Sequence, residues 1–528
     1  MEKRLDKATY PNNGVIYKGD YLETIPFDEY IKKEAIPSEN VYDIRDFGAT
    51  PNSGYIDTEA FMLAAVAASK TNGTVLVSGG EYITGSIQMY SNTTLFIDYG
   101  STIKASRCLD EFKDAFFKIQ DVENVTVRGG GKLHASGEYF VNLPKEKPLL
   151  SPLGYTKLPP VLLDPLGYPE DTIRFKYRER IRYQDDRWSK GEPNIKRPMY
   201  TFWIRNSKNI TVENIIIEDS LDWSLDIDFA ANITIKDIVI NNNRHVANTD
   251  GIDIMSSSNV LVSHCFVSTA DDGLCVKAPM LQGHDGLVTE DADLTMGPAR
   301  NIVFEDCTVC TVMNAFKIGT ETYFPIENVT LKNCNFIMPD IYPGTVSGIS
   351  IESADGSFIS NIKAENIKME NVVCPLFICL CKRNKFGYLN DEDRERLSEG
   401  GSISNVIIKD VDAKNMEIPC LLTGFNDGKT TRYISEITID NLKGEYLDNK
   451  EILDIRDPLY ENVKDYPESN AFGDLPAYGM FIRHAKNVKL SNTSFIPRSC
   501  NTRTEIVKVD VLYWLLPRAS PRGSDYQV

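Results

Sequence analysis

A short repeated unit constrains the fold of this chain more than any other feature. Each copy starts with an asparagine that is followed by alternating β-branched or apolar residues, as in Asn209-Ile-Thr-Val. The copies begin at Asn124, Asn209, Asn232, Asn259, Asn301, Asn328, Asn405 and Asn487. The closest copies are 23 and 27 residues apart. The alternation predicts one short strand per copy, and the asparagine predicts a bend at its start.

The spacing of the units selects among the all-β architectures. Helical patterns between the units are scarce, which disfavours β-α-β crossovers. Asn-Gly and Asp-Gly pairs at two-residue turns are few, which disfavours the hairpins of a sandwich. A propeller blade repeats at about 40–50 residues, which is longer than the spacing here. The period in the twenties therefore predicts a single parallel β-helix, with coils stacked about 4.8 Å apart.

The rest of the chain predicts one domain with additions. We expect residues 1–40 to form an N-terminal arm and residues 41–528 to form the β-helix domain. An alanine-rich segment around 57–69 predicts a helix that caps the first coil and protects the edge of the stack. Residues 138–198 break the repeat and are rich in proline, tyrosine and charge, which predicts a long loop insertion. That insertion is either a solvated excursion or one wall of a substrate cleft.

Charge and cysteine usage exclude several classes of partner. The chain has 57 Lys and Arg against 75 Asp and Glu, a net charge of −18, which disfavours nucleic acid and anionic membranes as partners. No apolar run reaches the roughly 18 residues of a membrane span. The first residues lack the apolar core of a secretory signal, and the eleven cysteines are scattered and odd in number. We therefore expect a cytoplasmic protein with reduced thiols, no cofactor and no metal, and we leave its oligomeric state open.

Three aspartates are candidates for catalysis. Asp250 and Asp271 are 21 residues apart, close to one coil, and Asp272 follows directly, so stacked coils place all three on one face. Like charges within a few ångström raise the pKa of one member and leave another ionised. Glycoside hydrolysis needs a neutral acid for the leaving oxygen and a carboxylate that activates water, about 6.5–9.5 Å apart in inverting enzymes. The alternative is that each aspartate only caps a turn.

Further segments match one known family. They are Tyr42–Ala49, Asp57–Ala60, Gly73–Val77, Arg197-Pro198 and Asp219–Trp223, together with Asn248-Thr249-Asp250 and Asp271-Asp272. From about residue 42 to about 375, and more weakly to the end, the sequence resembles the polygalacturonase family of glycoside hydrolases, family 28. The resemblance implies a right-handed parallel β-helix. It also implies that Asp271 is the general acid, and that Asp250 and Asp272 activate the hydrolytic water, with inversion at the anomeric carbon.

Two motifs of that family are altered in this chain. Asn314 stands where the family has the histidine of a Gly-His-Gly motif, and Ser350 and Glu352 replace the two cations of an Arg-Ile-Lys motif. The second change removes a clamp for a uronate carboxylate and adds a negative charge. This change therefore favours a neutral or differently linked sugar over galacturonate as the substrate. It also favours another carbohydrate reaction on the same scaffold.

Residues near the acidic motifs are candidates for substrate binding. They are Asn248, Trp223, His245, Lys277, Asn314, Lys317, Glu321 and Glu352. Lys277 and Lys317 either lower the pKa of a neighbouring aspartate, contact an anionic sugar or lie at the surface. Glu352 either contacts sugar hydroxyls, acts as a second acid or base, or faces solvent. Trp223 either stacks on a sugar or belongs to the core, and His245 either binds sugar or occupies a turn.

These features lead to three hypotheses of function. The first is an inverting glycoside hydrolase that acts on a pectin-derived or related plant oligosaccharide or polysaccharide. The insertion at 138–198 predicts exo action if it blocks one end of the cleft. The second hypothesis keeps the site but changes the reaction to that of a lyase, an epimerase or an intramolecular glycosyl transferase. The third is a β-helix that binds carbohydrate without catalysis.

Overall fold

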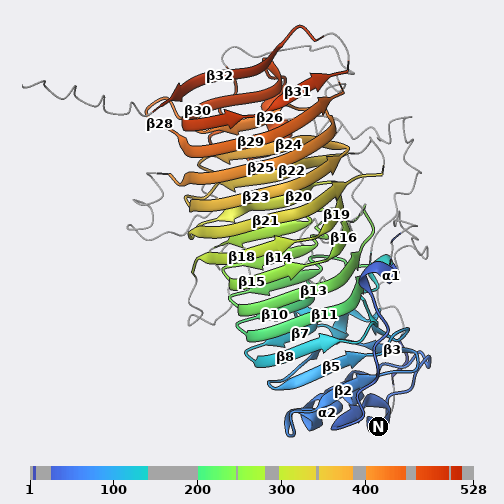
Figure 1. Cartoon of the computed structure of the whole chain (residues 1–528). Coiled ribbons are helices and arrows are strands. Elements are labelled where there is room, and N and C mark those ends of the chain that lie inside the picture. The colour runs from blue at the N-terminus through green and yellow to red at the C-terminus, as the bar shows by residue number, and fades with distance from the viewer. Residues whose placement is uncertain are drawn as a thin grey trace, which may run out of the picture.

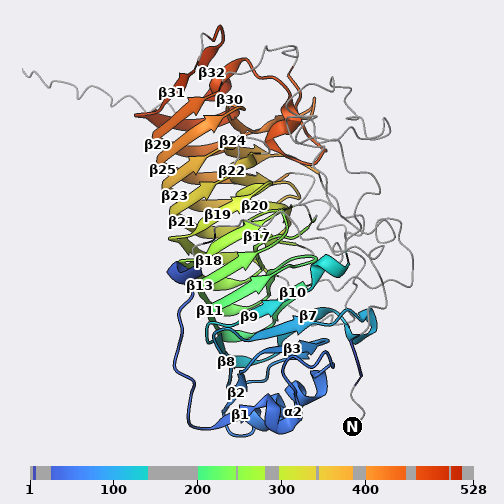
Figure 2. The same cartoon turned by 90° about the vertical axis from the view of Figure 1, so that its right-hand side faces the viewer.

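The repeated units fold as the strands of a parallel β-helix (Figure 1). The computed structural model describes residues 4–6, 25, 27–140, 200–244, 246, 248–279, 297–339, 344–383, 400–447, 459–498 and 501–513. Within these residues, 30 strands join one sheet that winds along the whole stack, while two strands form a separate small sheet. Figure 2 shows the coils from the side, with the first coil at the bottom and the last at the top.

The strands of the described residues are short near the N-terminus and longer toward the C-terminus. The first are β1 (Val41–Asp43), β2 (Thr74–Val77), β3 (Glu81–Thr84), β4 (Ile87–Gln88), β5 (Thr93–Ile97), β6 (Thr102–Ala105), β7 (Ala115–Gln120), β8 (Glu123–Arg128), β9 (Lys132–His134), β10 (Tyr200–Arg205), β11 (Lys208–Glu218), β12 (Leu225–Asp228), β13 (Ala231–Asn241), β14 (Ile252–Met255), β15 (Ser258–Ser263) and β16 (Phe266–Thr269). They are followed by β17 (Leu274–Ala278), β18 (Ala299–Glu305), β19 (Thr308–Thr311), β20 (Asn314–Thr322), β21 (Ile326–Ile337), β22 (Thr345–Ser353), β23 (Phe358–Glu370), β24 (Val372–Leu380), β25 (Ser402–Met416), β26 (Cys420–Thr423), β27 (Phe425–Asn426), β28 (Thr431–Arg432), β29 (Ile434–Tyr446), β30 (Ala477–Ser491), β31 (Ser494–Pro497) and β32 (Thr504–Leu512).

Apolar side chains fill the interior of the coils in vertical columns. Leu225 of β12 pairs with Ile252 of β14, which pairs with Leu274 of β17, and the column continues through Phe316 of β20 and Ile349 of β22. All five side chains are buried in the largest apolar cluster. Because side chains alternate along a strand, the residues between these positions face outward on the same strands. The alternation therefore fixes which side chains are available for a site.

The asparagines of the repeated unit form a hydrogen-bonded ladder along one corner of the stack. Each side-chain amide donates from Nδ2 to Oδ1 of the asparagine one coil earlier, over 2.6–3.1 Å. The ladder runs through Asn92, Asn124, Asn209, Asn232, Asn259, Asn301, Asn328, Asn361 and Asn405. Every member has a positive φ, a left-handed conformation that asparagine tolerates better than most residues. Two members, Asn92 and Asn361, escaped the sequence analysis, and Asn487 bonds Glu436 instead.

The N-terminal part of the chain covers the first coil and one side of the stack. Helix α2 (Thr58–Ser69) buries one face in the core at the bottom of the stack, which confirms the predicted capping helix (Figure 1). Its N-cap is Asp57, and Thr58 is its first residue. Helix α1 (Phe27–Tyr30) lies against the outside of β13, where Tyr30 packs on Phe266. Short 3-10 turns occur at Ile44–Phe47, Leu109–Glu111, Gly137–Tyr139 and Ser469–Phe472.

The structure does not test two predictions about the organisation of the chain. The insertion predicted at 138–198 lies outside the described residues from 141 onward, and the right-handed sense of the coils stays a prediction.

Ten cysteines, including Cys307 and Cys310, lie in the described residues, and all ten are buried free thiols. Among the described residues, no helix has the length and apolar character that crossing a membrane requires.

Candidate active site

The structure brings Asp250, Asp271 and Asp272 together on the outer face of the stack. Asp250 lies two residues before β14, and Asp271 and Asp272 lie just before β17. Ile252 of β14 is in register with Leu274 of β17, so Asp250 and Asp272 hold equivalent positions on successive coils. One carboxylate oxygen from each of the three lies within 4.8 Å of the others. The exposed fractions of Asp250, Asp271 and Asp272 are 4%, 8% and 5%, so the trio is largely desolvated.

The glycines that follow two of these aspartates are required by packing rather than by a turn. A Cβ on Gly251 would lie 2.3 Å from the carbonyl oxygen of Gly273, and a Cβ on Gly273 would lie 2.4 Å from Cγ1 of Val309. Neither glycine is among the residues with positive φ. The two Asp-Gly pairs therefore let successive coils approach closely enough for their carboxylates to meet.

Backbone hydrogen bonds position Asp271. Its Oδ2 accepts from the backbone N–H of Asn248 at 3.3 Å, and its Oδ1 accepts from the backbone N–H of Asp272 at 3.1 Å. The hydroxyl of Thr311 donates to the carbonyl oxygen of Asp271. Asn248, a predicted binding residue, thus contacts Asp271 through its backbone N–H, and its φ is 61°.

Lys277 is buried beneath the trio and paired with carboxylates. Its Nζ lies 2.7 Å from Oδ1 of Asp253 and 3.5 Å from Oδ2 of Asp250. The same Nζ lies 3.8 Å from the ring centroid of Trp223. Burial disfavours the charge, but Asp253 and Asp250 outweigh it and hold the pKa of Lys277 well above its usual value. Lys277 is 3% exposed, so the surface alternative is wrong.

Burial raises the pKa of several carboxyls at the site. Burial, together with the nearby Asp253 and Asp271, raises the pKa of Asp250 well above its usual value, although Lys277 opposes the shift. Burial also raises the pKa of Asp253 to about 6, again against Lys277. One coil earlier, burial raises the pKa of Asp228 to about 6. A raised pKa is the property that a carboxyl needs to act as a general acid.

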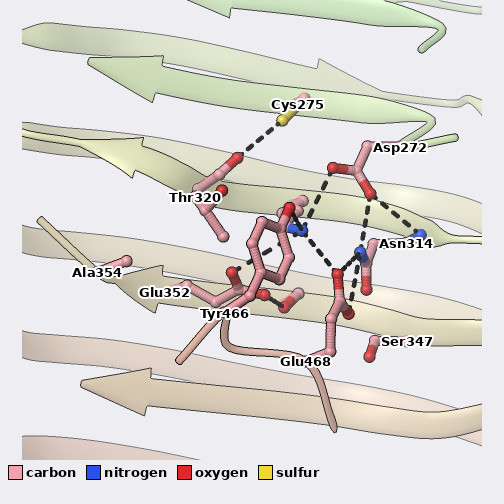
Figure 3. Close-up of polar contacts among 12 residues, drawn as sticks. Asp272, Cys275, Asn314, Thr320, Ser347, Glu352, Ala354, Tyr466 and Glu468 are labelled. Carbon is pink, nitrogen blue, oxygen red and sulfur yellow. Dashed lines mark hydrogen bonds and ion pairs between the residues drawn. The ribbon is translucent and has the colours of Figure 1, made fainter. Parts of the chain in front are cut away.

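A second group of polar residues adjoins Asp272 on the side of the later coils (Figure 3). Asn314 donates from Nδ2 to Oδ1 of Asp272 at 2.8 Å. Lys317 places Nζ at 3.4 Å from Oδ2 of Asp272, 3.1 Å from Oε1 of Glu468 and 3.8 Å from Oε2 of Glu352. Ser350 donates from Oγ to Oε1 of Glu352 at 2.5 Å. Lys317 and Glu352 are 1% and 0% exposed, so the surface alternative for Lys317 and the solvent-facing alternative for Glu352 are wrong.

Three other predicted binding residues have different outcomes. Trp223 is 6% exposed and packs with Tyr200 and Trp203 in an aromatic cluster that is separate from the main core, while its ring contacts Nζ of Lys277. Glu321 lies at the edge of the site, with Oε1 at 4.0 Å from Nη2 of Arg383. His245 lies outside the described residues.

The sequence analysis missed several residues of the site. Tyr466 and Glu468 lie in the polar segment between β29 and β30, about 150 residues after Lys317 in sequence. No local sequence pattern marks them as residues of the site. Asp226 and Asp253 face outward in register on β12 and β14, and both are buried. The alternation of those strands carries this signal, because each aspartate is flanked by two core positions. Burial and the charges of Asp228 and Asp253 raise the pKa of Asp226 well above its usual value.

Two groups in the described part of the chain have donor atoms close enough to share a cation. One is the trio itself, and the other consists of His134, Glu138 and Asp219. Burial and the nearby Lys104 lower the pKa of His134 to about 4, which leaves its ring neutral near neutral pH. In the trio, the buried Lys277 already supplies a positive charge beside Asp250.

Comparison with known proteins identifies the family. Residues 179–443, half of the chain, match the model of glycosyl hydrolases family 28. The chain belongs to glycosyl hydrolase family 28. An endo-polygalacturonase of Pectobacterium carotovorum subsp. carotovorum is 26% identical over 242 residues, which are 46% of this chain and 51% of that enzyme, so the match spans about half of its length. Polygalacturonase QRT2 of Arabidopsis thaliana is 23% identical over 429 residues, 77% of this chain and 82% of that protein.

Solved structures show the same fold. The family 28 exopolygalacturonase of Yersinia enterocolitica superposes with a TM-score of 0.63 at 14% identity, covering 90% of this chain and 78% of that one. The hyperthermoactive exopolygalacturonase of Thermotoga maritima superposes with a TM-score of 0.53 at 19% identity, covering 80% and 90%. Membership of family 28 makes the chain a glycosidase, as the sequence analysis predicts.

Proposed function

We propose that this family 28 glycosidase hydrolyses a pectin-derived or related plant oligosaccharide with inversion. The observation that carries the proposal is the convergence of three buried carboxylates, from two successive coils, within 4.8 Å of one another. Asp271 donates a proton to the leaving oxygen, and Asp250 and Asp272 activate the attacking water. The relatives are named polygalacturonases, so galacturonan oligosaccharides are the first substrates to test.

The raised pKa of Asp250 supports acid–base chemistry but adds a second assignment. Burial and the neighbouring carboxylates favour the protonated form of Asp250. Either Asp271 is the acid, as the resemblance implies, or Asp250 itself is the acid. The two assignments differ in which variant regains activity on a substrate with a leaving group that needs no protonation. Asp271→Asn regains it in the first case, and Asp250→Asn regains it in the second.

The stereochemistry of the reaction is the next point to test. Inverting enzymes hold a water between the acid and the base, whereas retaining enzymes form a covalent intermediate. Inversion follows from the roles proposed for Asp271, Asp250 and Asp272, and retention is the alternative.

The configuration of the fresh product distinguishes these mechanisms. A defined oligosaccharide is incubated with the enzyme, and proton NMR follows the anomeric signal of the new reducing end before mutarotation. Inversion is expected, and a first product with the anomeric configuration of the substrate would show retention. An unsaturated product that absorbs in the ultraviolet would instead indicate a lyase, and a product without a new reducing end would indicate a transferase. For the Asp271→Asn and Asp250→Asn variants, the matched control is Asp412→Asn, at an exposed position on β25.

We also propose exo action on short oligosaccharides in the cytoplasm, as the sequence analysis expects. Exo action predicts that mono- or disaccharide products accumulate from the start of the reaction, while the average length of a long polymer falls slowly. Early products of many lengths would show endo action.

A further inference from the structure

Five residues beside the trio form a cluster with a distinct chemistry. We call Asn314, Lys317, Glu352, Tyr466 and Glu468 the Lys317 cluster (Figure 3). Asn314 and Lys317 both contact Asp272, at 2.8 and 3.4 Å. A sugar held at the trio is therefore next to this cluster.

The positive charge of Lys317 is already compensated by three carboxylates. Asp272, Glu468 and Glu352 lie 3.4, 3.1 and 3.8 Å from its Nζ. Burial, with Glu468 and Asp272 added, raises the pKa of Glu352 despite the opposing Lys317. Burial raises the pKa of Glu468 as well. The three carboxyls and Lys317 together carry a net negative charge as long as no more than one of the carboxyls is protonated. A uronate brought here would meet repulsion that the low dielectric of a buried site strengthens.

The nearby arginine does not supply the missing cation. Arg383 donates from Nε to Oδ1 of Asp355 at 3.1 Å and from Nη2 to Oδ2 of the same carboxylate. Its Nη1 donates to Oγ1 of Thr320 at 3.0 Å. A guanidinium that forms both halves of a fork with Asp355 has little capacity left for a sugar carboxylate. Lys317 and Arg383 thus both have carboxylate partners in the described structure.

Two buried oxygens of the cluster lack a hydrogen-bond partner within the described protein. They are Oδ1 of Asn314 and Oε2 of Glu352, and both side chains are 0% exposed. A buried polar atom without a partner costs free energy, so a ligand that satisfies it gains affinity. The amide oxygen of Asn314 needs a donor, which a sugar hydroxyl provides and an ionised carboxylate does not. A hydroxyl also matches Glu352 in either protonation state, because it both donates and accepts.

Tyr466 offers an apolar surface at the same place. Its side chain is half exposed, and Nζ of Lys317 and Cζ of Arg383 lie 5.2 and 5.5 Å from its ring centroid. Lys317 also donates to the hydroxyl of Tyr466 at 3.4 Å. Cations at the ring hold it in place through its quadrupole. An aromatic ring held in this way and open to solvent can stack on the C–H face of a pyranose.

We propose that the Lys317 cluster is a subsite for an uncharged sugar, and that it selects against a uronate next to the trio. The proposal rests on the proposed function, because it names the sugar class that the same site accepts. It reverses the charge preference that an Arg-Ile-Lys clamp would create.

Matched oligosaccharides test the subsite directly. Trigalacturonate and its carboxyl-reduced form share their linkage and length and differ only in a carboxylate or a hydroxymethyl group on each ring. Binding of both to the catalytically impaired Asp271→Asn variant is measured by calorimetry. We expect the reduced form to bind at least tenfold more tightly. Equal or tighter binding of trigalacturonate, or binding of neither, overturns the proposal.

Turnover separates this proposal from the proposed function. If Asp271→Asn binds the reduced form selectively but the wild-type enzyme releases no new reducing ends from it, the subsite stands and the hydrolase proposal fails for that substrate. If the wild-type enzyme cleaves trigalacturonate at least as fast as the reduced form, at equal concentrations below saturation, the hydrolase proposal stands and the subsite proposal is wrong.

Variants of the cluster test the cause of the preference in the same Asp271→Asn background. Glu352→Gln keeps the shape but removes a negative charge, so the preference for the reduced form should fall at least fivefold. Glu370→Gln, at an exposed position on β23, makes the same chemical change away from the site and should leave the preference unchanged. Tyr466→Ala, at a half-exposed position, should weaken binding of the reduced form at least fivefold, whereas Tyr466→Phe should keep it. An unchanged preference in Glu352→Gln or unchanged affinity in Tyr466→Ala contradicts the proposal.

Discussion

Asn314 donates a hydrogen bond from Nδ2 to Oδ1 of Asp272, with 2.8 Å between the two atoms, and both side chains are buried. This neutral amide occupies the position where the resemblance to family 28 places a histidine. A histidine changes its charge near neutral pH, whereas an amide does not. The contact therefore orients one carboxylate of the trio without adding a titrating group.

Exchanging this amide for a carboxylate should damage the site. Asn314→Asp keeps the size of the side chain but replaces the donor with a third carboxylate, beside those of Asp272 and Glu468. We expect the free energy of unfolding to fall by about 1–3 kcal/mol and kcat to fall at least tenfold. Urea denaturation and initial rates measure the two effects. Unchanged values for both would show that the hydrogen bond has no role in positioning Asp272.

Buried aspartates outside the trio should make the stability of the protein depend on pH. The pKa of Asp253 is raised to about 6 in the folded state, against about 3.9 for an unfolded aspartate. Between about pH 4 and pH 6 the folded state keeps a proton that the unfolded state releases, so the free energy of unfolding falls as the pH rises. A shift of about two pH units corresponds to roughly 3 kcal/mol. Denaturation at several pH values measures this slope.

Replacing Asp253 with asparagine distinguishes its contribution to the pH dependence of stability from the contributions of other titrating groups. Asp253→Asn cannot titrate, so it should make the decline between about pH 4 and pH 6 shallower. Asp412→Asn, which changes an exposed aspartate, should leave the slope as in the wild type. An identical slope in Asp253→Asn and the wild type would contradict the raised pKa.

The sequence predicts the repeating part of the fold because the repeat is a local property. Asn209, Asn232 and Asn259 are one coil apart, and each needs both a left-handed conformation and a partner on the next coil. Asparagine satisfies both needs with one side chain, so the requirement is visible in the spacing. Asn361 belongs to the same ladder but was missed, although an apolar alternation follows it as in the other units.

The asparagine ladder yields a prediction about stability. Asn259 donates to Asn232 and accepts from Asn301, and its φ is 56°. Asn259→Ala loses both hydrogen bonds and strains the backbone, so the free energy of unfolding should fall by about 1–2 kcal/mol. Asn259→Gly loses the same bonds but accepts the positive φ, so its loss should be smaller. Equal losses in the two variants would show that conformation does not contribute.

The candidate site could be predicted only where its residues share the repeat. Asp250 and Asp272 are one coil apart, so their spacing in sequence indicates their proximity in space. Glu468 contacts Lys317 from a polar excursion about 150 residues later, and the repeat gives no information about where such an excursion folds. The burial of Lys277 was also left open, because a lysine at an outward-facing strand position is more often exposed.

Removing the buried ammonium should be costly for the fold. Lys277→Met leaves Asp253 and Asp250 without their cation, so the free energy of unfolding should fall by about 3–5 kcal/mol at neutral pH. The double variant Lys277→Met/Asp253→Asn should recover part of this loss, because one of the unpaired charges is gone. A double-mutant cycle from urea denaturation measures the coupling. Additive losses would show that the ion pair contributes nothing to stability.

The rate of Asp271→Asn on a defined oligosaccharide tests most directly whether the trio carries out hydrolysis. The variant is compared with the wild type and with Asp412→Asn after denaturation has shown that all three are equally folded. General acid catalysis by Asp271 predicts a fall in kcat of at least about 100-fold in Asp271→Asn and wild-type activity in Asp412→Asn. A folded Asp271→Asn variant that hydrolyses the substrate at a rate close to that of the wild type would contradict the account.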